Sequence, residues 1–158
     1  MISYADLTSQ TLAVRTKMAG FARANAAHAD RIPAGWNNNL RWHIGHLVVT
    51  PQRLTYGVMG EAVRVPEAYN GWFMKGTGPR DWGNAPVPPL EQLIEEMTAE
   101  SEKLFADMEP RLRLPYKQPY ETSVGIVLHN PADSLLMSYM HDGIHLGMLL
   151  ALGRALKG

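Results

Sequence analysis

Three histidines form the pattern with the clearest chemical meaning in this chain of 158 residues. His141 and His145 stand four positions apart in HDGIHLG, within an apolar stretch, 134–156, that is predicted to be one long helix. This spacing places both imidazoles on one helix face, about 40° apart. Two neutral imidazoles on adjacent turns can bind one divalent metal ion. The alternative is a hydrogen-bonded pair of core histidines.

A metal site of this kind needs at least a third ligand, which must come from upstream. The segment LGMLLALGRALKG after His145 contains no His, Asp, Glu or Cys. His46, in RWHIGHLVVT, is the best candidate. His43 is three positions earlier and is expected to have a non-ligand role. His28 and His129 are expected to be ordinary residues at the ends of elements.

Two serines extend the polar face of the same helix toward its N-terminus. Ser134 and Ser138 stand two turns and one turn before His141 on an otherwise apolar helix. Burying these polar side chains unpaired would cost several kcal/mol, so we expect the face to find partners.

The motif HDGIHLG differs from the HExxH motif of zinc proteases. A zinc protease uses the Glu after the first histidine as its general base, and here that position is Asp142, followed by Gly143. No third ligand follows downstream either. We therefore exclude this class, and we expect Asp142 to lie at the surface or behind the ligands.

Composition excludes several other classes of function. Lys and Arg number 15, as do Asp and Glu, and no basic run occurs, so no nucleic-acid partner is expected. Without cysteine there are no disulfides and no thiolate ligands, and any catalytic thiol must come from a substrate or cofactor. No signal peptide and no uninterrupted apolar run of about 18 residues is found. We expect one domain over 1–158 in a cytoplasmic protein without a membrane partner.

Hydrophobic periodicity predicts four helices, and loop lengths predict how they are connected. The predicted helices cover 5–28, 38–59, 89–108 and, from Asn130 or Asp133, a last segment ending at Leu156. Pro51 should kink or split the second helix, and Gly60 should end it. The irregular segment 61–89 can cross the roughly 30 Å length of a helix, so the second and third helices are expected to run parallel. A short strand is expected within SVGIVLH, and the fold class is an all-α four-helix bundle.

The two histidine-bearing blocks resemble those of the DinB family. The resemblance is carried by NNNLRWHIGHL, in which Trp42 precedes His46 by four positions, and by HDGIHLGMLLALGRAL, which contains His141 and His145. It implies an up-down-down-up bundle with a long crossover between the second and third helices. It also implies a three-histidine site for a divalent metal ion, usually nickel or zinc, and frequent homodimers.

The resemblance implies a range of functions rather than one reaction. Members include thiol-dependent S-transferases, which use a low-molecular-weight thiol, and metal-dependent hydrolases. The expected function is therefore that of a divalent-metal-binding protein acting as one of these enzymes on a small molecule. The alternative is a non-catalytic, metal- or small-ligand-binding protein of a stress response.

Four further residues have two interpretations or a supporting role. Trp42 is expected to pack beneath the metal-bearing turn. Trp72 and Trp82 either line a substrate entrance or, as we favour, fix the crossover to the bundle. Arg53 either binds a substrate carboxylate or forms a surface salt bridge.

Because helix flanks are apolar on more than one side, a homodimer is expected through helix faces.

Overall fold

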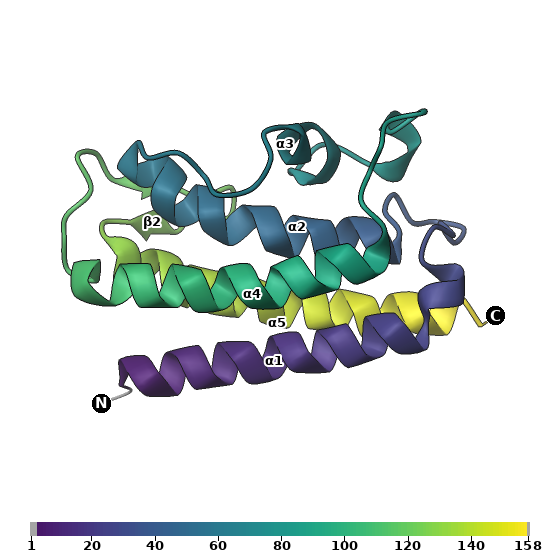
Figure 1. Ribbon diagram of the computed structural model, residues 1–158, viewed down its shortest axis with the longest axis horizontal. Helices are drawn as coiled ribbons and strands as arrows, with labels where there is room; N and C mark the ends of the chain where they lie inside the picture. The colour runs from purple at the N-terminus through teal and green to yellow at the C-terminus, as the bar shows by residue number, and fades with distance from the viewer. Residues whose placement is uncertain (1–2, 158) are drawn as a thin grey trace.

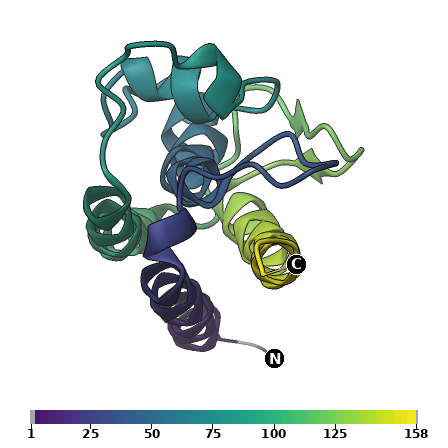
Figure 2. The ribbon, with the colours of Figure 1, turned by 90° about the vertical axis from the view of Figure 1, so that its right-hand side faces the viewer.

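Four long helices form the body of the protein (Figure 1), for which a computed structural model describes residues 3–157. The sequence-based prediction of an all-α bundle is confirmed. The long helices are α1 (Tyr4–Ala24), α2 (Leu40–Gln52), α4 (Leu90–Met108) and α5 (Pro131–Ala155). Viewed from one end, they surround a common core, and the segment between α2 and α4 covers the outer side of α2 (Figure 2).

Helices α2 and α4 run in the same direction, with the crossover between them. Gln52 donates to Glu100 over 3.2 Å, and further along both helices Tyr56 donates to Asp107 over 2.7 Å. Residue numbers therefore rise together along the two helices. Helices α1 and α5 run the opposite way (Figure 1).

Side-chain caps determine where α2 and α5 begin. The side chain of Asn39 accepts a hydrogen bond from the Trp42 amide at 2.8 Å, and that of Asn130 accepts one from the Asp133 amide at 3.1 Å. Each bond satisfies an amide that has no partner within its helix. Pro89 is the cap of α4 and not, as predicted, its first helical residue.

The first helix is shorter than predicted. Helix α1 ends at Ala24, and a separate 3-10 turn covers Ala26–His28. The side chain of Asn25 donates to the Phe21 carbonyl at 2.8 Å. It thereby satisfies a carbonyl of the last turn, which helps to end the α-helix there.

A π turn, η2 (Arg53–Gly57), follows directly after α2, within the segment predicted as the second helix. Pro51 remains inside α2 but has no amide hydrogen to donate to the preceding turn. The Thr55 hydroxyl also occupies the Pro51 carbonyl at 2.7 Å. Both effects disturb the regular hydrogen bonds of the α-helix. The irregularity expected at Pro51 is therefore a π turn, which is wider than an α-helical turn. Helical structure continues to residue 59, and Gly60, with φ of 76°, ends it as predicted.

The crossover is more ordered than the sequence suggested. It contains helix α3 (Ala68–Phe73) and a 3-10 turn (Pro79–Asp81). Tyr69 and Phe73 are buried and join the core around α2. Helix α3 is too short to show a helical period in the sequence, and for that reason it was not predicted.

The segment between α4 and α5 contains a 3-10 turn and a small hairpin. The turn covers Glu109–Arg111, and strands β1 (Tyr120–Glu121) and β2 (Val127–Leu128) pair antiparallel. The predicted extended run thus includes β2. Gly125, with φ of 80°, lies in the hairpin turn.

A buried ion pair between α1 and α5 also contacts α4 and thereby joins three helices. Arg15 of α1 donates to both carboxylate oxygens of Asp142, at 2.7 and 3.0 Å, and to Ser101 of α4 at 2.5 Å. Asp142 is fully buried. Of the two positions expected for Asp142, the surface position is wrong, because its polar partner comes from α1 inside the bundle.

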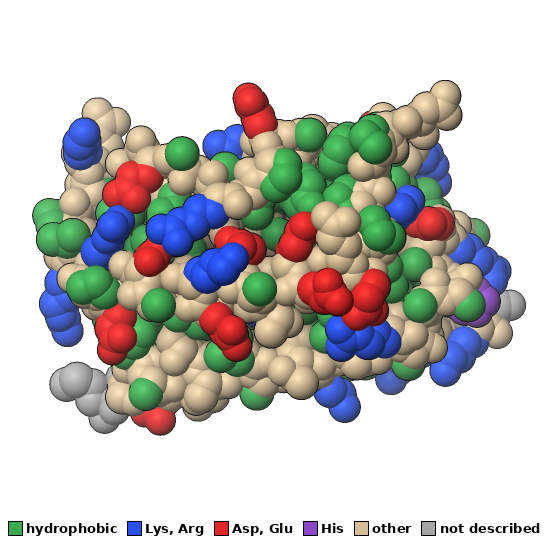
Figure 3. Space-filling model, viewed as in Figure 1, with side chains coloured by type: hydrophobic (Ala, Val, Ile, Leu, Met, Phe, Trp, Pro, Cys, Tyr) green, Lys and Arg blue, Asp and Glu red, His purple; other side chains and the backbone are tan. Residues whose placement is uncertain are grey.

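Helix α5 meets the length and apolarity of a membrane span, with a mean hydropathy of 1.2 over its best window. In this fold it packs against α1 and α2 and carries the buried Asp142. Of that window, 39% is buried within the bundle. On the face seen in Figure 3, acidic and basic side chains are interspersed without a large patch of one sign.

Candidate metal centre

The structure brings His46, His141 and His145 together between α2 and α5. The Nε2 atom of His141 lies 3.2 Å from that of His46 and 3.1 Å from that of His145. One nitrogen from each ring lies within 4.8 Å of the other two. Nitrogens about 2.1 Å from a shared ion stand about 3.0–3.4 Å apart at octahedral or tetrahedral angles. The three histidines are therefore positioned to bind one metal ion.

The crossover determines which nitrogen of His46 is available. Its Nδ1 lies 2.5 Å from the main-chain carbonyl oxygen of Phe73. A carbonyl only accepts, so Nδ1 carries the proton and Nε2 keeps its lone pair. The ring also stacks on Trp42, with centroids 4.7 Å apart and planes 11° from parallel. Trp42 is buried as expected, and it orients His46 directly.

A glycine allows the Phe73 carbonyl to come so close to α2. A Cβ atom at Gly45 would overlap three atoms of the Phe73 ring. Without a side chain at this position, the ring lies directly on the α2 backbone. Gly45 therefore permits the contact that orients His46, its neighbour in the sequence.

His43 supports the site without belonging to the three-histidine group. It is fully buried, and its Nδ1 lies 3.0 Å from Nδ1 of His145. For Nε2 of His145 to offer a lone pair, its Nδ1 must carry the proton and donate to His43. His43 would then carry its own proton on Nε2, a buried atom for which no hydrogen-bond partner is found among residues 3–157.

Burial keeps the cluster neutral. Desolvation lowers the pKa of His43, His46 and His141 to about 4. Nearby positive charge adds to each shift, and at His46 the hydrogen bond to the Phe73 carbonyl opposes it. For His145 desolvation and the other three histidines lower the pKa to about 2. Neutral imidazoles have the free lone pairs that a metal ion requires. Imidazole donors suit several divalent metal ions, among them zinc, copper, iron and nickel.

The histidines lie at one side of a cleft of about 510 Å³. One wall comes from α2, with Trp42 and Thr50, and from η2, with Leu54, and another comes from α5. The crossover contributes Met74, Lys75 and Gly76, and the hairpin region contributes Tyr120, Thr122 and Ser123. His141 is partly exposed, so the site is accessible from this cleft.

Neither Trp72 nor Trp82 lines this cleft. The Trp82 indole donates to the Trp72 carbonyl at 3.1 Å, and the Arg41 guanidinium lies 4.8 Å from its ring centroid. The Trp42 indole similarly donates to Thr77 at 3.1 Å. These contacts fix the crossover onto α2, which is the interpretation favoured from the sequence.

The remaining polar candidates lie outside the three-histidine group. Arg53 donates to Asn70 at 2.9 Å and borders an adjoining cavity. Ser134 contacts the Tyr116 hydroxyl at 2.7 Å, and Ser138 donates to the Ser134 carbonyl. The two serines thus find partners, as expected, within the scaffold. His28 and His129 are exposed.

Sequence reasoning did not identify the crossover and hairpin residues that line the cleft. Lys75 and Thr122 lie in irregular segments that show no periodic pattern. The Phe73 carbonyl is a main-chain group and leaves no trace in residue type. Gly45 did leave a signal, because a glycine inside a helix costs about 1 kcal/mol and calls for a packing explanation.

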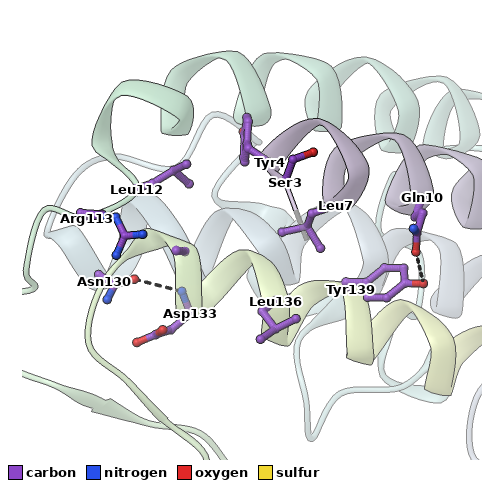
Figure 4. Close-up of a pocket in the computed structure, with 11 residues that line it drawn as sticks. Ser3, Tyr4, Leu7, Gln10, Leu112, Arg113, Asn130, Asp133, Leu136 and Tyr139 are labelled. Carbon is purple, nitrogen blue, oxygen red and sulfur yellow. Dashed lines mark hydrogen bonds between the residues drawn. The ribbon is translucent and has the colours of Figure 1, made fainter. Parts of the chain in front are cut away.

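A second cavity, of about 440 Å³, lies between the N-terminal parts of α1 and α5 (Figure 4). Its hydrogen bonds join Asn130 to Asp133 and Tyr139 to Gln10. The described residues that line it include no histidine, and its Asp133 accepts from the main chain of His129. The cleft at the histidines is therefore the candidate functional site.

Comparison with known proteins agrees with this location. No match was found among curated proteins. A family model described as the DinB superfamily matches residues 10–149, a range that contains all three histidines. The chain therefore belongs to the DinB superfamily.

Proposed function

We propose that this protein binds a divalent metal ion, nickel or zinc, through His46, His141 and His145 and acts as a metal-dependent enzyme. The observation that carries the proposal is the convergence of three neutral imidazoles beside a cleft of about 510 Å³. When bound, an ion with three protein ligands supplies Lewis acidity and open coordination positions. The reaction type we propose is thiol-dependent S-transfer or hydrolysis of a small molecule.

The chain's own residues would bind and orient the reactants. Phe73 and Trp42 hold the His46 ring, and His43 holds that of His145. The chain has no cysteine, so a low-molecular-weight thiol would supply the nucleophile in S-transfer. Thr50, 3.2 Å from Nε2 of His46, places a hydroxyl group beside the reactants.

One observation supports the alternative of a non-catalytic metal- or small-ligand-binding protein in a stress response. The described residues that line the cleft include no Asp or Glu. A general base other than the histidines is therefore missing from the lining. In this alternative the same cleft binds its ligand without reaction.

Metal analysis of protein purified without a histidine tag tests the proposal. We expect about one nickel or zinc ion per chain, and loss of that ion in His141→Ala with the bundle still folded. His129→Ala, which removes an exposed histidine, is the matched control. A screen of thiol transfer and hydrolysis on the loaded protein separates enzyme from binding protein. Wild-type protein that takes up no divalent ion would contradict the proposal.

We also propose a cytoplasmic homodimer associated through α5, without nucleic-acid or membrane partners. Support comes from the exposed apolar side chains at four-residue spacing on α5. Leu136, Met140 and Ile144 are 59%, 39% and 48% exposed. A second copy of this helix would cover a face that the bundle leaves open.

A further inference from the structure

The cleft at the histidines adjoins another cavity beside the π turn η2. This adjoining cavity, of about 460 Å³, shares Met74 and Tyr120 with the cleft as lining residues. Arg53 of η2 lines one side of this cavity, and Gln118 comes from the segment before β1. A ligand that begins at the three histidines can therefore extend past Met74 and Tyr120 toward Arg53.

The lining of the combined groove is positive. Lys75 lines the cleft and Arg53 lines the adjoining cavity, whereas the lining residues described for both include no Asp or Glu. Within residues 3–157, neither cation forms an ion pair with a carboxylate. The whole chain has 15 basic and 15 acidic residues, so the imbalance is local.

Arg53 is held in place by neutral groups. Its Nε donates to the side chain of Asn70 in α3 at 2.9 Å. Its Cδ lies 3.5 Å from the position of a Cβ on Gly57, so the aliphatic stem rests against a residue without a side chain. Both residues belong to the π turn η2, a form of helix that often marks functional sites. The two terminal amino groups of the guanidinium form no hydrogen bond with another described side chain or carbonyl, which suits two-pronged binding of a carboxylate.

We propose that Arg53 binds the anionic end of an elongated ligand whose other end lies at the three histidines. The ligand class is a molecule with a metal-binding group, a body that passes Met74 and Tyr120, and a terminal carboxylate. Lys75 lies along the path and adds positive charge. This proposal rests on the proposed function, because the three-histidine site holds the other end of the ligand.

Paired synthetic thiols provide the test on the full-length protein loaded with cobalt(II). Each pair consists of an ω-mercaptocarboxylate and the ω-mercaptoalcohol of equal length, over a series of increasing chain lengths. The thiol-to-cobalt absorption band gives the Kd of each probe. At the lengths that span the groove, we expect the carboxylate to bind roughly fivefold more tightly than the alcohol, as for one ion pair with an exposed arginine.

Two variants locate the effect. In Arg53→Gln we expect most of the carboxylate preference to be lost while alcohol binding stays unchanged, with Lys75 responsible for any preference that persists. Arg80→Gln removes an exposed cation of the same crossover that lines neither cavity, and it should keep the preference. An equal preference in wild type and Arg53→Gln, no preference at any length, or no binding of either probe series would overturn the proposal.

A separate measurement distinguishes failure of the Arg53 anion site from failure of the proposed function. Cobalt binding is titrated first, and its absence in the wild type contradicts the three-histidine metal site alone. The NMR signal of the Arg53 Nε–H group, assigned by its loss in Arg53→Gln, then reports on the anion site with or without metal. We expect the carboxylate probe to shift this signal and the alcohol to leave it in place. An unshifted signal with saturating carboxylate counts against the anion site.

Discussion

Nδ1 of His43 and Nδ1 of His145 face each other across 3.0 Å between α2 and α5. Only one of the two nitrogens can carry the proton in a hydrogen bond between neutral rings. Which of the two Nδ1 atoms carries the proton decides whether Nε2 of His145 has a free lone pair for a metal ion. A residue outside the three-histidine group thus controls the state of one inside it.

Replacing His43 should therefore weaken metal binding. In His43→Leu, Nδ1–H of His145 loses its acceptor, and we expect metal affinity to fall by roughly 10- to 100-fold. In His43→Asn, the side-chain oxygen replaces Nδ1 as an acceptor at a similar distance from the backbone, so much of the affinity should return. Competition with a chromogenic chelator measures both. Equal affinities for wild type and His43→Leu would show that His43 has no such role.

Gly45→Ala should disturb both the fold and the site. The new Cβ overlaps the Phe73 ring, so the ring must move and take its carbonyl away from His46. We expect a loss of about 1–3 kcal/mol in the free energy of unfolding and weaker metal binding. Urea denaturation and chelator competition measure the two effects.

Gly20→Ala is the control for this substitution. Gly20 lies in α1, and a Cβ there would meet no atom within 4 Å. Alanine at this position should leave metal affinity unchanged and raise stability by up to about 1 kcal/mol. A Gly45→Ala protein that behaves like this control would contradict the role assigned to the Phe73 contact.

Arg15→Met should strongly destabilise the bundle. It leaves the fully buried Asp142 carboxylate without its partner, which typically costs about 3–5 kcal/mol. Adding Asp142→Leu removes the unpaired charge, so the double variant should recover much of the loss. Denaturant midpoints of the two variants test this, and a double variant no more stable than Arg15→Met would be inconsistent with it.

Stability of the metal-free protein should decrease in mild acid. The histidines of the unfolded chain take up protons below about pH 6.5, whereas burial holds those of the cluster neutral until about pH 4. The unfolded state then binds more protons, so the free energy of unfolding falls as the pH decreases through this window. Each such histidine contributes up to about 1.4 kcal/mol per pH unit.

Urea denaturation with a chelator present, at several pH values from about 7 to 4, measures this dependence. His43→Leu has one buried imidazole fewer and should show a shallower decrease. Identical slopes for this variant and the wild type would argue against the depressed pKa of His43.

The exposed face of α5 predicts association. Light scattering should give the mass of a dimer for the wild type and of a monomer for Ile144→Glu, because a charge there would be buried against the second copy. Val124→Glu changes another exposed residue, 59% exposed in the hairpin turn, and should remain dimeric. A monomeric wild type at micromolar concentration would refute the homodimer.

The fold was largely predictable because its helices carry strong local signals. The apolar period of α4 and the Asn39 and Asn130 caps are readable from a few neighbouring residues. His141 and His145 could be assigned to one site because a four-residue spacing defines a helix face, and His46 was the best upstream candidate for the third ligand. The pairing of Asp142 with Arg15 was not foreseeable, because it depends on how α1 packs against α5. The residues of the cleft walls were not predictable either, since Lys75 and Thr122 come from segments without periodicity.

The ligand-bearing helices lie far apart in the chain, and His141 follows His46 by 95 positions. Closing a loop of that length is entropically costly, so the three rings meet only after α5 has docked on α2. During synthesis, a ribosome must therefore release α5 before an ion can be captured by all three rings. A nascent chain or a truncated product that lacks α5 would offer His46 alone. Metal loading would thus select for molecules whose folding has reached the last helix.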